Sequence, residues 1–442
     1  MLAPIDWNRL YDDHLMQLKA RVDTALAHTG FDALLVFSGR LRYQFLDDAP
    51  YPFKPNPQFK LWLPLTRHPE CWIAYKPGSK PVLVYYQPED YWHETPEAPA
   101  GYWVDAFDIR IVTDPRDAAT HLPGGRVAVL AEGDTGLEAW PANNPAPLLQ
   151  ELHYWRAAKS SYELALMRAA SDLGVRGHRA AHQAFIEGES EYGIHLRYVQ
   201  ATGLTEQELP YGNIVALNQH CAVLHYQYQR SAKPLQHLSL LIDAGAQVHG
   251  YASDITRTHA RHPGCFADLI AGMEALQLDL CAMVRPGVPY PDIHLAAHRH
   301  IAALLADSKL VRMDPIQMVE TGVTSVFFPH GVGHLLGLQV HDVAGFARNP
   351  QGDAIPKPPG HPHLRLTRTL EADFVVTIEP GLYFIPSLLK TLADGPHAGL
   401  VDWSAVEALQ HYGGIRIEDD VRARADGAPE NLTREAFARL AA

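Results

Sequence analysis

The N-terminal part of the chain combines one amphipathic stretch with short apolar runs. Apolar residues recur there at steps of four, three, four and four, which predicts one buried face of a helix. These residues are Tyr11, Leu15, Leu18, Val22 and Leu26. Gly30 follows where a helix is expected to stop. Short apolar runs separated by longer segments come next, and they predict strands of a mixed sheet in an α/β domain. The runs are residues 33–37, 71–74, 82–86 and 127–130.

The pattern changes shortly before residue 160. Ser160 and Glu163 have the spacing of a capping box, in which each side chain binds the backbone N–H of the other residue. An apolar-periodic stretch follows, so a long helix is expected to begin there. We therefore place a domain boundary near residue 158, between an N-terminal domain of residues 1–157 and a C-terminal domain of residues 158–442.

The C-terminal part alternates helices with strand pairs, which predicts an α+β domain. Residues 238–243 and 251–258 flank a turn-rich segment and read as a hairpin. Residues 374–378 form an apolar strand that ends at a Glu-Pro-Gly turn signal, and residues 415–418 follow two glycines. The segment 349–362 is crowded with proline and glycine and is expected to be a loop.

The hairpin carries the first candidate site. If it centres near residues 248–249, Asp243 and Asp254 lie opposite each other, with Cβ atoms about 4.5–5.5 Å apart. Two carboxylates at that distance repel each other unless a proton or a cation lies between them. Taken alone, a turn-forming aspartate and a surface-strand aspartate explain the pair equally well.

Three further segments carry candidate chemistry. His330, His334 and His341 form a glycine-framed cluster that could supply a metal ligand and proton shuttles, although a single histidine is more often structural. Glu379 ends an apolar strand, as Asp243 does. Glu418 alternates with isoleucines, as does Arg416 two residues earlier, so both are expected on one strand face, where a surface salt bridge is the alternative explanation.

Together these residues predict a dinuclear metal site. The four acids Asp243, Asp254, Glu379 and Glu418 carry a formal charge that balances two divalent cations, and His334 adds one imidazole. An oxygen-rich donor set of this kind favours Mn²⁺, with Co²⁺, Zn²⁺ or Fe²⁺ as alternatives. Such a site would hold a bridging hydroxide and polarise a carbonyl group, so we expect a hydrolase.

Composition restricts the remaining classes of function. The net charge of −13 argues against nucleic-acid binding, which needs a basic surface. Four cysteines without metal-site spacing predict free thiols. The chain has no apolar run of the roughly 18 residues that a membrane span requires and no secretory signal pattern, so a cytoplasmic protein without a membrane partner is expected.

In these motifs the chain resembles the creatinase/prolidase/methionine-aminopeptidase superfamily of pita-bread enzymes. Within it the chain is similar to the bacterial prolidases, which are Xaa-Pro dipeptidases. Residues 46–59, 334–342 and 379–384 carry the closer likeness. The resemblance implies an α/β plus α+β fold: an N-terminal creatinase-like mixed-sheet domain followed by a C-terminal pita-bread catalytic domain.

The resemblance also assigns roles to residues. It implies that Asp254 and Glu418 bridge two metal ions, that Asp243 binds one of them, and that His334 and Glu379 complete the other. Glu379 would also act as acid or base, and His330 and His341 would stabilise the intermediate or move protons. The residues implied for substrate binding are His225 and Arg416 at the proline carboxylate, Asp47 or Asp48 at the substrate amine, and Tyr211, Leu224 and Tyr290 in the pocket.

The implied substrate is a small dipeptide, and the implied assembly is a homodimer in which an aspartate of the pair Asp47 and Asp48 could reach across the interface. Hydrolysis of organophosphorus acid anhydrides is an implied side activity. Two alternatives stay open. One is another pita-bread enzyme, aminopeptidase P or methionine aminopeptidase, and the other is a metal-free creatinase-like hydrolase or peptide-binding module.

Overall fold

Helix α1 (Trp7–Thr29) opens the computed structural model, which describes residues 5–440. The Asp6 side chain caps its first turn by accepting a hydrogen bond from the backbone N–H of Arg9, and Gly30 ends the helix in the left-handed conformation at φ 72°. All five residues of the predicted apolar face are buried. The helix, its buried face and its glycine stop are thus confirmed.

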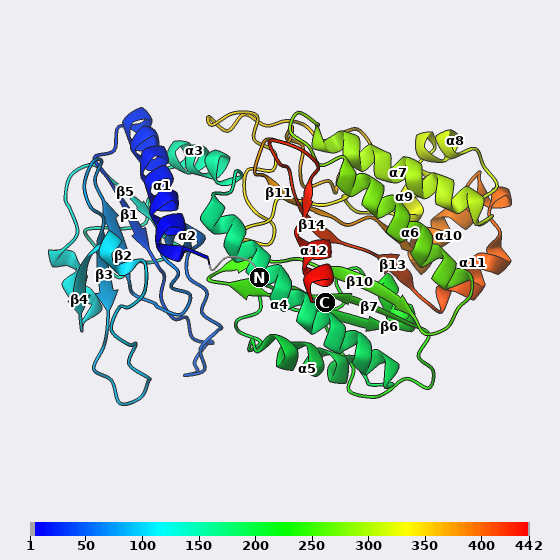
Figure 1. Cartoon of the computed structure of the whole chain (residues 1–442), viewed down its shortest axis with the longest axis horizontal. Coiled ribbons are helices and arrows are strands. Elements are labelled where there is room, and N and C mark those ends of the chain that lie inside the picture. Colours follow the sequence, from blue (N-terminus) through cyan, green and yellow to red (C-terminus); the bar gives the residue numbers. More distant parts are fainter. Residues whose placement is uncertain (1–4, 441–442) are drawn as a thin grey trace. The chain divides into compact units, whose positions relative to one another are not determined.

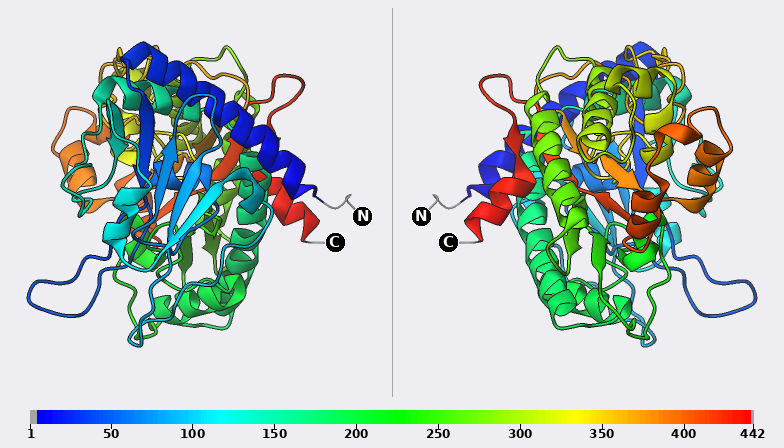
Figure 2. Two further views of the ribbon diagram at one scale, coloured as in Figure 1. Left: turned by 90° about the vertical axis from the view of Figure 1, so that its left-hand side faces the viewer. Right: turned by 90° about the vertical axis from the view of Figure 1, so that its right-hand side faces the viewer.

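Helix α1 belongs to a compact unit that runs to Leu166 and also takes in Asn349–Asp353. The core of this unit is a five-stranded sheet in the order β4-β3-β2-β1-β5, which can be followed in blue and cyan in the left-hand view of Figure 2. The strands are β1 (Ala33–Phe37), β2 (Trp72–Tyr75), β3 (Val82–Tyr86), β4 (Asp108–Val112) and β5 (Val127–Leu130). The remaining helical elements are α2 (Pro57–Trp62), η1 (Val104–Ala106), η2 (Pro115–Thr120) and α3 (Ala146–Arg156).

The sheet is mixed, as predicted, because β1 pairs antiparallel with β2 and parallel with β5. The four strands expected from apolar runs are present. The sequence reading missed β4, which pairs parallel with β3 at the sheet edge. The centre of β4 is exposed, and such a strand tolerates charged residues. Ile109 and Ile111 therefore alternate with Asp108 and Arg110, and the strand shows no apolar run.

The second unit comprises Met167–Arg348 and the chain from Ala354 onward. Helix α4 (Ser161–Ile186) leads into it and begins at the predicted capping box. The backbone N–H of Ser160 donates to Glu163 Oε2 at 2.7 Å, and the backbone N–H of Glu163 donates to Ser160 Oγ at 3.3 Å. The predicted helix start is therefore confirmed.

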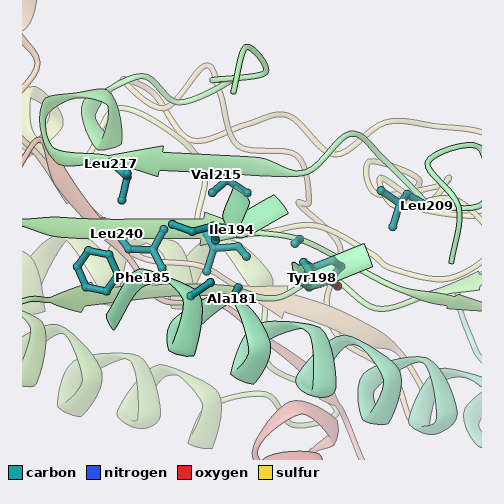
Figure 3. Packing of buried hydrophobic residues seen from close by; sticks show 11 residues of the cluster. Ala181, Phe185, Ile194, Tyr198, Leu209, Val215, Leu217 and Leu240 are labelled. Atoms are coloured by element: carbon teal, nitrogen blue, oxygen red, sulfur yellow. The ribbon is translucent and has the colours of Figure 1, made fainter. Parts of the chain in front are cut away.

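One apolar core of the second unit lies where α4 and α5 (Glu191–Thr202) cover a three-stranded sheet in the order β10-β7-β6. The strands are β6 (Ile214–Leu217), β7 (Ser239–Asp243) and β10 (Thr256–Ala260). Figure 3 shows Phe185 of α4 and Tyr198 of α5 beneath the strands that carry Val215 and Leu240. This packing makes the sheet a rigid base for the residues at its ends.

The other elements of this unit are seen in Figure 1, where α6 and α7 pack side by side. They are η3 (Asn218–Ala222), β8 (Gln247–Val248), β9 (Tyr251–Ala252), α6 (Cys265–Ala282), α7 (Tyr290–Asp307), α8 (Pro315–Glu320), α9 (Val323–Phe327), β11 (Val375–Ile378), β12 (Gly381–Tyr383), α10 (Pro386–Ala393), η4 (Ala398–Leu400), α11 (Trp403–Gln410), β13 (Gly414–Arg416), β14 (Asp419–Arg422), β15 (Glu430–Asn431) and α12 (Leu432–Arg439). The antiparallel pairs β11–β14 and β12–β13 agree with the α+β prediction.

The predicted hairpin exists, but its register differs from the expectation. Asp243 pairs with Thr256, and Gln247 pairs with Ala252, so the turn falls at residues 249–250. The expected opposition of Asp243 and Asp254 is therefore wrong. Asp254 lies in the break between β9 and β10, two positions from the partner of Asp243. Because side chains alternate with a period of two, both aspartates still reach the same face.

The four cysteines are free, in agreement with the prediction, and three of them are buried. Within the described stretch 5–440, every helix is either too short or too polar to cross a membrane.

A buried histidine links α4 to the sheet. His178 is 2% exposed, and its Nε2 atom lies 2.9 Å from the carbonyl oxygen of Ala244, while Nδ1 has no hydrogen-bond partner. Burial lowers the pKa of His178 to about 3, because a charged imidazole would be separated from water and would face the positive charge of Arg257. The folded protein thus holds His178 neutral.

We expect His178 to contribute to acid sensitivity. The unfolded chain takes up its proton near the ordinary pKa of about 6.5, whereas the folded chain does not do so until about pH 3. Stability from this group is complete above pH 6.5 and falls as the pH drops towards 3. In His178→Gln, the free energy of unfolding in urea should depend less on pH between 6.5 and 4, by up to about 1.4 kcal/mol per pH unit. An unchanged slope would contradict this assignment.

Candidate metal centre

The acidic residues of the candidate site come from strand ends that meet in the second unit. Asp243 is the last residue of β7, Asp254 precedes β10, and Glu418 lies between β13 and β14. A β-bridge joins Thr256 to Glu418, and the Thr256 hydroxyl donates to Glu418 Oε2 at 2.7 Å. The topology therefore brings together carboxylates that are up to 175 positions apart in the sequence.

Tyr211 connects the two aspartates. Its hydroxyl group lies 2.8 Å from Asp243 Oδ1 and 2.5 Å from Asp254 Oδ1. Gly245 makes room for this arrangement, because a Cβ atom there would lie 2.1 Å from the carbonyl oxygen of Ser253 and 2.7 Å from the Tyr211 ring. The predicted proximity of the two acids thus arises from a shared face and a common hydrogen-bond partner.

His334 is held with one ring nitrogen towards the acids. Its Nδ1 atom lies 2.9 Å from the carbonyl oxygen of Leu335, which fixes Nδ1 as the donor. Its Nε2 atom lies 3.5 Å from Asp254 Oδ2 and 3.7 Å from Glu379 Oε1. An imidazole whose second N–H is bound to a backbone carbonyl is the usual arrangement of a metal-ligating histidine.

The glycine before His334 is required by the backbone. Gly333 has φ +150°, and a Cβ atom there would lie 2.1 Å from the carbonyl oxygen of Thr377 and 2.3 Å from the Tyr290 hydroxyl. Thr377 also accepts the backbone N–H of His334 on its side-chain oxygen at 3.0 Å. The glycine-framed motif thus lets the chain approach β11 closely enough to aim His334 at the acids.

The donor atoms are close and removed from water. Asp254, His334 and Glu418 each offer one ligand atom, and these atoms lie within 4.8 Å of one another. All three residues are buried, whereas the side chains of Asp243 and Glu379 are 14% and 18% exposed. The centre is thus closed on one side and open on the side of Asp243 and Glu379.

Burial and mutual repulsion shift the acidity of this cluster. Burial raises the pKa of Glu379 to about 7, and burial together with the charge of Asp254 raises the pKa of Glu418 well above its usual value. Burial opposes the charged form of Asp254 as well, but the contact with His334 outweighs it and lowers the pKa of Asp254. So many acids in one dry site require protons or cations to compensate them.

Arg416 lies beside this cluster, is 4% exposed, and makes a hydrogen bond within the protein from each of its three guanidinium nitrogens. It donates to Asp243 Oδ2 at 2.7 Å, to the Tyr383 hydroxyl at 3.0 Å and to the Thr256 hydroxyl at 3.3 Å. The sequence suggested that Arg416 and Glu418 share one strand, but β13 ends at Arg416. Both residues nevertheless meet at Thr256, so the predicted convergence of their side chains is observed.

The other two histidines of the motif border the cluster. His330 Nδ1 lies 2.8 Å from the carbonyl oxygen of Gly331, and its Nε2 lies 2.9 Å from the Tyr383 hydroxyl. The same ring approaches Glu379 Oε2 at 3.6 Å. His341 is exposed, and its ring centroid lies 4.4 Å from that of His334. Both predicted histidines thus lie beside proposed ligands of the cluster, His330 next to Glu379 and His341 next to His334.

The predicted substrate-binding residues fall in different settings. His225 is exposed, and its charge influences the pKa values of His330 and His341. Leu224 packs, half-buried, against the apolar cluster that includes Tyr383. Tyr290 is buried, and its hydroxyl donates to the carbonyl oxygen of Thr377 at 2.7 Å, so it supports the backbone behind His334.

Asp47 and Asp48 lie in the first unit, on an exposed loop. Asp47 Oδ1 accepts the backbone N–H of Ala49 at 3.1 Å, and this bond lowers the pKa of Asp47. Both residues are exposed surface groups. Their suggested contact with the substrate amine stays a prediction.

Four residues that join the network were given no role from the sequence: Thr256, Thr377, Tyr383 and Asp420. Asp420 is 1% exposed, and its carboxylate accepts the backbone N–H of Asp254 at 3.1 Å. Tyr383 links His330 to Arg416. Hydroxyl side chains are common in strands, so the role of Thr256, Thr377 and Tyr383 is revealed only by their contacts. Asp420 could have been noticed in the sequence because it follows Glu418 and Asp419, but an acidic run of this kind is ambiguous.

The residues present fit a divalent cation centre. The donor set combines several carboxylate oxygens with one imidazole nitrogen whose tautomer is fixed, and a cation would offset the repulsion among the acids.

Two family models cover most of the chain. The model of the Xaa-Pro dipeptidase N-terminal domain matches residues 9–154, and the model of metallopeptidase family M24 matches residues 165–425. A protein of Stenotrophomonas maltophilia (strain K279a) named Xaa-Pro dipeptidase is 52% identical over 98% of both chains. A protein of the same name from Xanthomonas oryzae pv. oryzae (strain MAFF 311018) is also 52% identical over 98% of both chains.

Solved structures show the same fold. Escherichia coli aminopeptidase P superposes with a TM-score of 0.70 at 22% identity and covers 95% of each chain. Pseudomonas aeruginosa aminopeptidase PepP gives a TM-score of 0.68 at 24% identity over 96% of this chain and 98% of that one. These likenesses concern the fold alone.

The family models and the structural match confirm the predicted combination of an N-terminal creatinase-like mixed-sheet domain and a C-terminal pita-bread catalytic domain. Membership of a metallopeptidase family, together with the clustered donors, also supports binding of divalent metal ions. The chain therefore belongs to metallopeptidase family M24 and, within the pita-bread superfamily, to the family of the bacterial prolidases.

Proposed function

We propose that the chain hydrolyses Xaa-Pro dipeptides at a dinuclear metal centre. The observation that carries this proposal is the buried convergence of Asp254, His334 and Glu418, with Asp243 and Glu379 at its open side. The full-length relatives at 52% identity that are named Xaa-Pro dipeptidase support the choice of substrate. The family and the donor set together point to a metallo-hydrolase rather than a metal-free binding module.

Five residues would hold two divalent cations. Asp254 and Glu418 would bridge them, Asp243 would bind one, and His334 and Glu379 would complete the other. Mn²⁺ is the favoured ion because carboxylate oxygens dominate the donor set. When bound, the cations would acidify a water molecule and polarise the peptide carbonyl group.

Proton movement would fall to residues at the open side. Glu379 is suited to act as acid and base because burial raises its pKa to about 7. His330 lies 3.6 Å from Glu379 and 2.9 Å from the Tyr383 hydroxyl, so it could stabilise the developing negative charge. His341, which is exposed and packs against His334, would pass protons to solvent.

Arg416 and His225 would receive the carboxylate of the proline residue. Arg416 donates to Asp243, Thr256 and Tyr383, so a substrate carboxylate would bind to its remaining N–H groups or replace one of these partners. Metal binding by Asp243 would weaken its pairing with Arg416 and release donor capacity for the substrate. Tyr211, Leu224 and Tyr290 would shape the pocket.

The remaining assignments extend the same proposal. Asp47 or Asp48 would bind the substrate amine in a homodimer, and the enzyme would work in the cytoplasm. Hydrolysis of organophosphorus acid anhydrides stays a prediction based on resemblance.

A peptide ladder tests the substrate class. A dipeptide Xaa-Pro presents both an amine and a proline carboxylate to the site, whereas a longer Xaa-Pro peptide lacks the carboxylate at that position. We expect release of the Xaa residue from Ala-Pro and no measurable release from Ala-Pro-Ala. Chromatographic assay of the manganese-loaded protein measures both. Preferential cleavage of Ala-Pro-Ala would identify an aminopeptidase P instead.

Asp254→Asn tests the metal centre. The amide removes a negative charge and one bridging oxygen, so we expect loss of metal ions and of nearly all hydrolysis of Ala-Pro. Elemental analysis of the purified variant and initial rates check both effects. The exposed Asp426→Asn serves as the matched control, and it should keep metal and activity. An Asp254→Asn protein with two ions and full turnover would refute the bridging assignment.

Arg416→Ala tests recognition of the substrate carboxylate. A charged hydrogen bond contributes about 1.5–3 kcal/mol, so the preference for Xaa-Pro over its C-terminal amide should fall about 10- to 100-fold. The ratio of kcat/KM for Ala-Pro and Ala-Pro-amide measures this preference. Arg422→Ala removes an arginine that instead pairs with Asp373 and Glu430, so it should keep the ratio. An unchanged ratio in Arg416→Ala would exclude the proposed contact.

A further inference from the structure

A second cluster of metal-ligating side chains lies outside the candidate metal centre. His294 and His298 are one helical turn apart on α7 and share one face of it. His361 comes from the segment between α9 and β11, in which the structure has no helix or strand. Each of the three residues offers one ring nitrogen, and these atoms lie within 4.8 Å of one another.

The three rings form a nearly regular triangle. Their centroids are 4.8 Å apart for His294 and His298, 4.6 Å for His294 and His361, and 4.7 Å for His298 and His361. His298 Nδ1 lies 2.9 Å from the Thr324 hydroxyl, which leaves its Nε2 atom available as a ligand. A side-chain partner on the second ring nitrogen is what orients a metal-binding histidine.

The cluster is incompletely satisfied by hydrogen bonds. His294 is 1% exposed, its Nε2 atom lies 2.9 Å from His361 Nδ1, and its Nδ1 atom has no hydrogen-bond partner. A buried polar group without a partner costs about 1–3 kcal/mol. The three imidazoles share one hydrogen bond among themselves, between His294 and His361, which is a poor arrangement for a purely structural network. A bound cation would engage the lone pairs of their ring nitrogens.

The charge state of these histidines suits a metal. Burial, followed by the proximity of the other imidazoles, lowers the pKa of His294 to about 2 and that of His298 to about 3. Burial also lowers the pKa of His361. All three rings are thus neutral near pH 7, as metal ligation requires.

A cavity of about 230 Å³ adjoins the cluster. All three histidines line it, as do Phe328 and His330. The Phe328 ring packs 5.0 Å from His298 and 4.8 Å from His330, so it lies between the cluster and the histidine that borders the candidate metal centre. None of the five proposed ligands of that centre lines the cavity. The space is large enough for water or a small anion beside a bound ion.

We propose that His294, His298 and His361 bind one divalent transition-metal ion, with Zn²⁺ as the best fit, at a site separate from the candidate metal centre. Three neutral imidazoles without a carboxylate favour zinc over manganese. Zinc–nitrogen distances of about 2.0–2.1 Å require the donor atoms, which now lie within 4.8 Å of one another, to adjust their spacing around the ion. The proposal requires His361, whose segment has no helix or strand, to shift relative to α7 when the ion binds. The fourth position then faces the cavity, and the ion fastens this segment to α7.

The experiment measures zinc binding in the full-length protein. The proposal predicts that metal-free protein reloaded with excess Zn²⁺ and desalted keeps one more ion per chain than His361→Ala. In an Asp254→Asn background, which removes the candidate metal centre, we expect one ion, and its affinity should fall at least about 100-fold when His361→Ala is added. Elemental analysis and calorimetric titration with Zn²⁺ give these numbers. Co²⁺ in the same background should show the visible absorption of a tetrahedral site.

Two further variants control the result. His300→Ala removes a partly exposed histidine from the same helix and should leave the extra ion in place. His298→Ala should lose it, and circular dichroism would show that the fold is kept. Equal zinc content and affinity in the parent and in His361→Ala would overturn the proposal. The comparison is also made in the Asp254→Asn background. It therefore tests the histidine site even if the proposed dinuclear centre proves to be wrong.

Discussion

Repulsion among buried carboxylates is the constraint on which the rest of the structure depends. Asp254 and Glu418 are buried beside Asp243 and Glu379, and an uncompensated charge in such a place is costly. Burial raises the pKa values of Asp243, Glu379 and Glu418, so without a metal ion the cluster favours protonated acids, and Arg416 offsets only part of the charge. Divalent cations would neutralise these carboxylates, and the relief of their mutual repulsion would strengthen metal binding.

The surrounding protein holds these acids close together despite their mutual repulsion. Arg257 donates to the backbone carbonyl group of Glu418 and to the buried carboxylate of Asp419, whose pKa is lowered to about 2 because the nearby arginines outweigh burial. Gly245 and Gly333 allow close backbone approaches that a Cβ atom would prevent. The acids are thus held by rigid strands and by hydrogen bonds from Tyr211, Arg416 and Thr256 rather than by attraction to one another.

The sequence predicted much of this and missed what depends on three-dimensional contacts. The apolar periods located α1, four of the five strands of the first sheet and the start of α4. The position of Asp254 could not be read correctly, because the hairpin register depends on where the turn falls, and a shift of two residues keeps every side chain on the same face. The hydrogen bond between Arg416 and Asp243 could not be predicted either, since these residues are 173 positions apart in the sequence. They meet because Thr256 pairs with Asp243 in the sheet and its hydroxyl accepts a hydrogen bond from Arg416. The cluster of His294, His298 and His361 was missed because two of its members look like ordinary core positions of a helix.

The central claim is that the buried acids and His334 exist to hold two divalent cations. Anomalous diffraction from a crystal of the manganese-loaded protein tests it most directly. We predict two manganese peaks, each within about 2.0–2.6 Å of its ligand oxygens, with Asp254 and Glu418 touching both ions and His334 Nε2 touching one of them. A map with no anomalous peak between these residues, at full manganese saturation, would contradict it.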